Sequence, residues 1–124
     1  MNTLWIFLGA GLGGVFRYWI ANGTYYFLGR QFPYGTLVVN VSGCLLMGVL
    51  FVIISERFDT IAPQLRSFLL IGLLGGYTTF STFSIETLNL FENGAWLSAG
   101  LNVVLNVSLC LLAVWIGVIG GRQV

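Results

Sequence analysis

Charged residues are so sparse in this sequence that the gaps between them leave four apolar runs of about 20 residues each. The chain has 124 residues, of which five are basic and four are acidic, and 57% are hydrophobic. Soluble domains have roughly 25% charged residues, whereas a helix of about 20 apolar residues is long enough to cross a bilayer. The sequence therefore predicts an all-α integral membrane protein with four transmembrane helices.

The predicted spans cover the chain, with no linker, low-complexity tract or soluble domain between them. They run from about Leu4 to Ala21, Thr36 to Ser55, Pro63 to Phe91 and Ala95 to Ile119. The N-terminal MNTLWIF has neither a basic region nor a small-residue cleavage site, so it is interpreted as the first span rather than a removable signal. Residues 1–124 are expected to form a single four-helix transmembrane domain.

The connections between spans carry their own signals. Residues 21–35, ANGTYYFLGRQFPYG, are rich in aromatic residues and glycine and are expected to lie at the membrane interface. Asp59 or Thr60 is expected to cap the third helix, with Pro63 in its first turn. The tripeptide ENG at residues 92–94 predicts the turn before the fourth span.

The composition argues against an enzyme and against most metal sites. The chain has no histidine, and its two cysteines, Cys44 and Cys110, both fall within predicted spans, where packing is the favoured role over a disulfide or a metal site. Zinc, haem and iron–sulfur sites are therefore not expected. Acid–base and nucleophilic catalysis also lack their usual groups, because two of the four acids lie in one loop and the other two near a helix end. No nucleic-acid partner is expected.

The arginines give only a weak preference for one orientation in the membrane. Four spans place both termini on the same side, together with Arg57, Arg66 and Arg122. The opposite side has Arg30, joined by Arg17 if that residue lies near the surface. With so little asymmetry under the positive-inside rule, the chain could insert both ways up. Four short helices also enclose little volume, so an oligomer is expected.

The third span contains an unusual segment, GGYTTFSTFS, at residues 75–84. Two adjacent glycines weaken a helix, and within a bilayer a non-helical backbone persists only where it is buried in protein or coordinates something. We therefore expect the third helix to be broken at its centre, near Gly75 and Gly76. The first half would end in carbonyl groups that suit a cation, and the second would begin with amides and hydroxyls that suit an anion.

If the helix continues from Thr78, its 100° steps place Phe80, Phe83, Ser81 and Ser84 on one face. Aromatic rings have positive edges, so ring edges beside hydroxyl and amide donors could solvate a small anion without a trapping charge. Weak binding at several positions is what ion conduction requires. The alternative is that the phenylalanines pack and the hydroxyls bond back to their own helix.

Four polar residues in the other spans allow two interpretations each. Arg17 is either an intramembrane attractor for anions or an interfacial side chain that reaches outward. Asn40 lies well inside the second span on the face of Gly43, where a role at an ion pathway is favoured over helix-to-helix hydrogen bonding. For Asn102 and Asn106, hydrogen bonding between helices is favoured.

Three motifs stand out: GAGLGGVFRY at residues 9–18, GTLVVNVSGCLLMG at residues 35–48 and GLLGGYTTFSTFS at residues 72–84. Together they resemble the Fluc (CrcB) family of bacterial fluoride channels. The resemblance extends over the whole chain in length, number of spans and order of motifs, and the third motif is highly specific. It implies a passive fluoride channel in the bacterial inner membrane, built as an antiparallel, dual-topology homodimer with two fluoride pathways.

The same resemblance implies a role for individual residues. Phe80 and Phe83 would line the pathways near Asn40, and Ser81 and Ser84 would be candidates for a track of hydroxyl groups. The backbone carbonyls of Gly75 and Thr78 from both subunits would hold a structural Na⁺. Arg17 would lie near an aqueous vestibule. The partners implied are the fluoride ion, membrane lipid and a second copy of the chain.

Two other functions compete with a fluoride channel. A small four-helix multidrug exporter would be expected to carry an acidic residue in the middle of a span, whereas Arg17 occupies the first span and Glu86 lies toward the end of the third. A non-transporting assembly protein would not need a hydroxyl-rich, interrupted helix. Both are weaker interpretations than the channel.

Overall fold

The computed structural model describes residues 2–57 and 62–123 and contains no β-strand in that part of the chain. The elements are α1 (Asn2–Leu28), α2 (Tyr34–Arg57), α3 (Ala62–Leu65), the π-helix η1 (Arg66–Leu74), α4 (Gly75–Tyr77), α5 (Phe80–Glu92) and α6 (Trp96–Gln123). Four stretches are long and apolar enough to cross a membrane: Asn2–Leu28, Tyr34–Arg57, Pro63–Glu92 and Trp96–Gln123. The prediction of an all-α protein with four spans is confirmed. The expected cap at Asp59 or Thr60 lies outside the described residues.

The first helix is longer than its sequence indicates. A connection was expected from Ala21, but α1 continues through this segment to Leu28. The helix ends at Gly29, whose φ of +83° suits glycine and whose N–H donates to the Tyr25 carbonyl across 2.8 Å. Within the segment, the Thr24 hydroxyl bonds to the Ile20 carbonyl at 2.8 Å, so this polar side chain is satisfied without leaving the helix.

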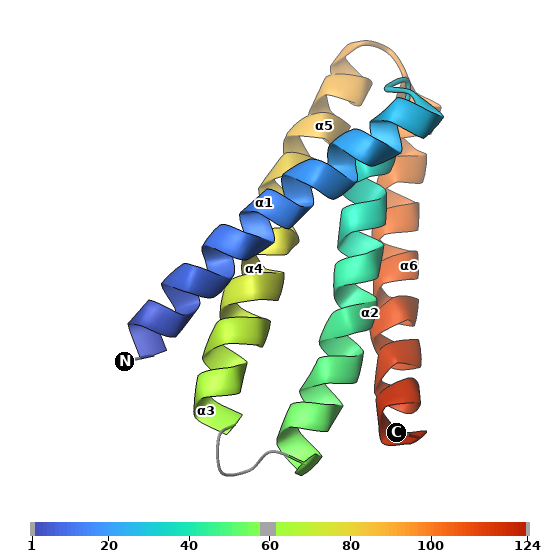
Figure 1. Cartoon of the computed structure of the whole chain (residues 1–124). Helices are drawn as coiled ribbons and strands as arrows, with labels where there is room; N and C mark the ends of the chain where they lie inside the picture. Colours follow the sequence, from blue (N-terminus) through green and yellow to red (C-terminus); the bar gives the residue numbers. More distant parts are fainter. Residues whose placement is uncertain (1, 58–61, 124) are drawn as a thin grey trace.

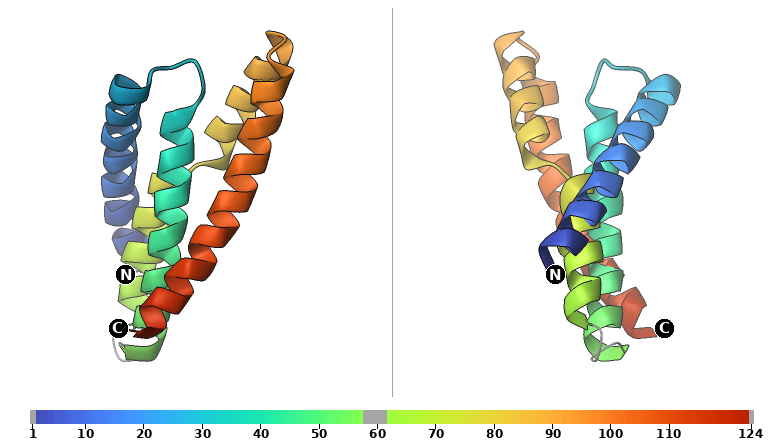
Figure 2. Two further views of the ribbon diagram at one scale, coloured as in Figure 1. Left: turned by 90° about the vertical axis from the view of Figure 1, so that its right-hand side faces the viewer. Right: turned by 60° about the vertical axis from the view of Figure 1, so that its left-hand side comes forward.

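The helices form two groups that share α2. Helices α2 and α6 run side by side in the same direction, whereas α1 crosses obliquely over η1 and α4 (Figure 1). Beyond α4 the chain changes neighbours, because α5 packs mainly against α6 (Figure 2). Both chain ends lie at the end of the molecule opposite the α1–α2 and α5–α6 connections (Figure 1). The third span thus contacts α1 with its first half and α6 with its second.

Glycines allow the backbones to approach closely where these helices cross. A Cβ atom on Gly9 or Gly13 of α1 would collide with the backbone of Phe68 or Leu73 in η1. At the other crossing, a Cβ atom on Gly48 of α2 would meet the backbone of α6. The expectation that Gly9 and Gly13 permit close backbone contact is confirmed.

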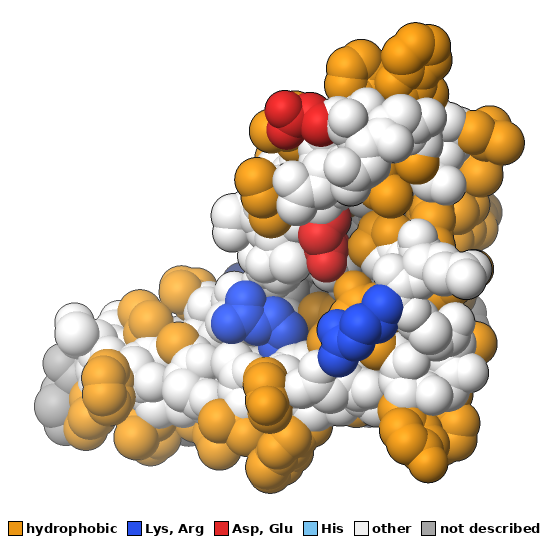
Figure 3. All heavy atoms as spheres, turned by 90° about the horizontal axis from the view of Figure 1, so that it is seen from above, with side chains coloured by type: hydrophobic (Ala, Val, Ile, Leu, Met, Phe, Trp, Pro, Cys, Tyr) orange, Lys and Arg blue, Asp and Glu red, His pale blue; other side chains and the backbone are white. Residues whose placement is uncertain are grey.

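The buried core is small and the outer surface is apolar. The core cluster consists of Val39, Ile54, Leu70, Leu74 and Tyr77. Large hydrophobic side chains are exposed on all four spans. Seen from above, many hydrophobic side chains project from the rim of the molecule (Figure 3). A helix that is apolar on every side fits a lipid environment rather than water. Polar groups are instead gathered inside, around the middle of the third span.

Candidate functional site

Two residues with extended backbone separate α4 from α5. Thr78 has φ −86° and ψ 156°, and Thr79 has φ −151° and ψ 125°. Gly75 and Gly76 lie within α4, so these glycines are not the non-helical residues that the sequence led us to expect. A Cβ atom on Gly76 would lie 2.6 Å from the Ala10 carbonyl oxygen of α1. That glycine is therefore required for packing, and the chain leaves the helix two residues later.

The extended segment is held by side chains that replace helical hydrogen bonds. Asn40 of α2 accepts from the Thr79 N–H at 3.1 Å and donates to the Thr79 carbonyl at 3.4 Å. The Thr79 hydroxyl caps α5 by accepting from the Thr82 N–H at 3.3 Å. In a continuous helix these two amides would bond to the carbonyls of Gly75 and Thr78, four residues earlier. Both carbonyls therefore lack their helical partner.

A chain of amide groups extends from this segment into α6. Asn40 Nδ2 donates to Asn106 Oδ1 at 3.1 Å, and Asn106 Nδ2 donates to Asn102 Oδ1 at 2.9 Å. Asn102 Nδ2 in turn donates to the Thr87 hydroxyl of α5 at 2.8 Å. All three asparagines are buried. The hydrogen bonding between helices expected for Asn102 and Asn106 is confirmed, and Asn40 bonds both to α6 and to the extended segment.

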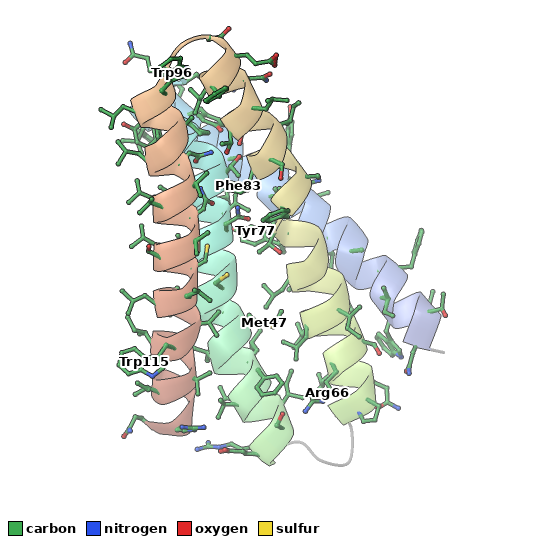
Figure 4. All side chains as sticks on the ribbon, turned by 180° about the vertical axis from the view of Figure 1, so that it is seen from behind. Met47, Arg66, Tyr77, Phe83, Trp96 and Trp115 are labelled. Carbon is green, nitrogen blue, oxygen red and sulfur yellow. The ribbon has the colours of Figure 1, made fainter. Side chains whose placement is uncertain are left out.

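The segment borders a cavity of about 350 Å³ that brings Asn40, Phe80 and Phe83 together. The two rings have centroids 5.3 Å apart and planes inclined by 47°. Phe83 is 8% exposed and points inward, whereas Phe80 is 77% exposed. Figure 4 shows Tyr77 and Phe83 near the middle of the molecule, where the third span is interrupted. The lining residues are Asn40, Cys44, Thr78, Thr79, Phe80, Phe83, Asn106, Val107, Cys110 and Leu111.

The structure separates Ser81 and Ser84 from this cavity. Ser81 is exposed, and its hydroxyl lies 3.2 Å from the Thr79 hydroxyl. The Ser84 hydroxyl donates to the Phe80 carbonyl at 2.9 Å within α5, which is the alternative considered from the sequence. Ser84 also lines an adjoining, more open hollow, which shares Phe83 with the cavity. Three of the four predicted residues of α5 thus line two adjacent spaces, and Ser81 lines neither.

Arg17 lines a third hollow, of about 330 Å³, on the other side of Thr79. Its half-buried position places it neither in the core nor fully at the surface. The same hollow is lined by Thr82 and Glu86. Charged side chains of both signs border the recess at this end of the molecule (Figure 3). Thr79 lines both this hollow and the cavity, and Phe83 lines both the cavity and the hollow at Ser84. The three spaces therefore follow one another.

Two residues near this site were assigned no role there from the sequence. Glu86 Oε2 accepts from the Tyr25 hydroxyl at 3.3 Å, while its Oε1 is buried without a hydrogen-bond partner among the described side chains. Asn106 joins Asn40 at the cavity wall. For Asn106, the available sequence signal was its spacing of four residues from Asn102 on one helix face. No sequence pattern distinguishes Glu86 from an interfacial acid.

Comparison with known proteins decides the family. The family model described as "CrcB-like protein, Camphor Resistance (CrcB)" matches residues 4–118. The chain belongs to the CrcB family. Among curated CrcB-family relatives, the protein named "Fluoride-specific ion channel FluC" from Coxiella burnetii (strain Dugway 5J108-111) is 58% identical over 123 residues, which cover 99% of each chain. The protein of the same name from Magnetococcus marinus is 45% identical over 124 residues, covering 100% of each chain.

Proposed function

We propose that this CrcB-family chain is a passive, fluoride-selective channel of the bacterial inner membrane. The observation that supports it most directly is the cavity between α2, α5 and α6, whose lining contains amides, hydroxyls and aromatic rings and no charged side chain. Ring edges and amide N–H groups stabilise a small anion, while the absence of a full positive charge there keeps binding weak. The protein transports an ion and does not catalyse a reaction.

The pathway follows the order of the hollows. Fluoride would enter near Arg17, pass Thr79 and reach the cavity between Asn40 and the rings of Phe80 and Phe83. The bond from Asn40 Nδ2 to the Thr79 carbonyl is long, at 3.4 Å, so it is the one that a fluoride ion would replace. Ser84 and Thr87, which line the next hollow, would receive the ion after Phe83. Ser81 is exposed beside this route and completes the proposed hydroxyl track.

Transport would be driven by the membrane potential. Hydrogen fluoride is neutral and enters cells through lipid, and it loses its proton in the near-neutral cytoplasm. The charged fluoride ion cannot leave through lipid. A negative interior then expels the anion through an open pathway without ATP or a coupled proton.

The working channel is proposed to be an antiparallel, dual-topology homodimer with two pathways. Phe80 is 77% exposed in the single chain, and Gly75 is also exposed, so the open face of the third span runs through the proposed site. A second copy seated on this face would cover the Phe80 ring and enclose the cavity. Burial of such exposed rings is a large favourable term in association.

A structural Na⁺ is proposed at the centre of that dimer. The carbonyls of Gly75 and Thr78 have lost their helical partners, since Asn40 and the Thr79 hydroxyl occupy the amides that would pair with them. Carbonyl oxygens of unwound backbone are suitable ligands for Na⁺. Two such oxygens from each subunit would surround the ion and stabilise the interrupted segment in both chains.

Fluoride efflux from liposomes tests the channel. The purified protein is reconstituted into liposomes with Na⁺ present, and a K⁺ ionophore dissipates the membrane potential that anion efflux builds up. Fluoride is then expected to be released, and chloride far more slowly. A fluoride electrode measures the rate. Equal release of both anions would contradict a selective channel. Release of neither anion would also contradict it and would favour a non-transporting assembly protein.

A further inference from the structure

The two cysteines of the chain occupy one level of the contact between α2 and α6. These helices run in the same direction (Figure 1). Cys44 and Cys110 each lie four residues beyond a hydrogen-bonded pair, Asn40 and Asn106. Four residues beyond the cysteines, a Cβ atom on Gly48 would collide with the Val114 carbonyl. Hydrogen-bonded amides on one side and a glycine contact on the other therefore fix the two thiols opposite each other.

The thiol pair faces the cavity in which fluoride is proposed to bind. Cys44 and Cys110 are both free and half-buried, and both line the same space as Asn40 and Phe83. The described residues contain no group of three or more histidine, cysteine, aspartate or glutamate side chains that could hold a metal. Zinc and iron–sulfur sites need more ligands than these two. Two opposed sulfurs suit a soft cation that accepts two ligands.

We propose that Cys44 and Cys110 form a two-coordinate site for a soft metal cation such as Ag⁺, Cu⁺ or Hg²⁺, and that its occupation closes the cavity to fluoride. Each thiol releases its proton to water as its sulfur forms one bond to the metal, so two protons leave and no electron is transferred. With a monovalent cation the bis-thiolate carries a negative charge, which repels an incoming anion. The closure of the cavity to fluoride rests on the proposed function. The binding of the metal is independent of it.

Silver binding is measured first, independently of transport. The purified protein is mixed with silver nitrate in a chloride-free buffer, passed over a gel-filtration column and analysed for silver. Wild type is expected to retain one silver ion per chain, and Cys44→Ser/Cys110→Ser none. Each single variant should lose most of the retained silver, because only one of the two sulfur ligands remains. If Cys44→Ser/Cys110→Ser does not elute like wild type, the variant Cys44→Ala/Cys110→Ala is measured in its place.

Two outcomes of this measurement would overturn the site. Retention by the double variant would show that the silver binds elsewhere. Retention of half an ion per chain by a single variant would show that one sulfur from each of two copies holds the metal, rather than a pair within one chain.

Fluoride efflux then tests the closure. Silver is expected to slow efflux through wild type by roughly tenfold or more, and an excess of dithiothreitol should restore it. The double variant is compared with its own silver-free rate, which silver should leave unchanged. If one silver ion binds per chain but efflux is not slowed, the proposed closure of the cavity is wrong, while the proposed metal site stands. A protein that binds silver but conducts no fluoride in any condition would instead contradict the proposed function.

Discussion

The side-chain amide of Asn40 lies against the backbone of Thr79, accepting from its N–H at 3.1 Å and donating to its carbonyl at 3.4 Å. Two paired residues of neighbouring β-strands exchange bonds in the same way. One side chain of α2 thus acts as a strand partner for a segment that has none, and the conformation of the third span depends on the second.

Replacing Asn40 with leucine is expected to destabilise the protein and to abolish fluoride efflux. The part-buried Thr79 N–H would lose its hydrogen-bond partner, at a cost of about 1–3 kcal/mol. Chemical denaturation and liposome efflux measure the two effects. Asn106→Leu is the matched control, because it also removes a buried amide but keeps the contact between Asn40 and Thr79. An Asn106→Leu variant as inactive as Asn40→Leu would contradict this division of roles.

Substitution of Phe80 or Phe83 should affect folding stability differently but lower fluoride transport in both cases. Phe83 is 8% exposed and Phe80 is 77% exposed, so Phe83→Ile is expected to cost about 1 kcal/mol of folding stability in the chain and Phe80→Ile almost none. Both variants should lower fluoride efflux while gel filtration still shows the wild-type assembly. Phe7→Ile, on an exposed part of α1, should transport normally. Unchanged efflux in both pathway variants would return the rings to a packing role.

Alanine at the crossing of α2 and α6 is expected to destabilise the bundle. A Cβ atom on Gly48 would collide with the Val114 carbonyl, and one on Gly117 with the Leu45 carbonyl. Overpacking of this kind costs about 1–3 kcal/mol. Gly100→Ala, in the same helix α6 but with nothing within 4 Å of the added atom, should be neutral or stabilising by up to about 1 kcal/mol. Thermal denaturation in detergent compares them, and equal stability of all variants would refute a close crossing.

Arg17 is expected to raise the local concentration of anions rather than to bind fluoride tightly. Arg17→Gln should slow fluoride efflux several-fold at low ionic strength, and the difference should shrink as salt screens the charge. Arg122→Gln, at the exposed end of α6, removes the same charge far from the hollow and should have little effect. A loss of efflux in Arg17→Gln that is independent of salt would indicate a structural role instead.

Removal of Na⁺ from both sides of the membrane is expected to stop fluoride efflux. The Gly75 and Thr78 carbonyls would then face one another across the proposed dimer axis without a cation between them, which is electrostatically unfavourable. Efflux is measured with N-methylglucamine in place of Na⁺ and again after Na⁺ is returned. Full activity in strictly Na⁺-free solution would rule out the structural ion while leaving the fluoride pathway intact.

The apolar runs between charged residues located the four spans, because burial in lipid is a property of a whole run of residues. They placed the end of α1 too early, at Ala21, since polar and aromatic side chains such as Thr24 and Tyr25 indicated a loop. In the structure the Thr24 hydroxyl bonds within the helix and the Tyr25 hydroxyl reaches Glu86. Neither contact can be inferred from local composition.

The site was only partly accessible to the same reasoning. The pairing of Asn40 with Phe80 and Phe83 follows from the motifs, and the structure places all three at one cavity. The position of the extended residues does not follow, because it depends on a long-range contact: Gly76 must remain helical against Ala10, and Asn40 selects Thr79. Helix propensity assigns the interruption to the glycines, whereas tertiary packing assigns it to the threonines.

The close crossings of α1 with η1 and of α2 with α6 also determine which substitutions this chain tolerates. Many outward-facing leucines and valines are exposed in the single chain, so many apolar replacements would serve there. Gly9, Gly13, Gly48 and Gly117 each face a backbone with no space for another atom. In a saturation-mutagenesis library selected for fluoride resistance, the strictest sequence requirement should therefore fall on the smallest residues, which reverses the usual pattern of a soluble core.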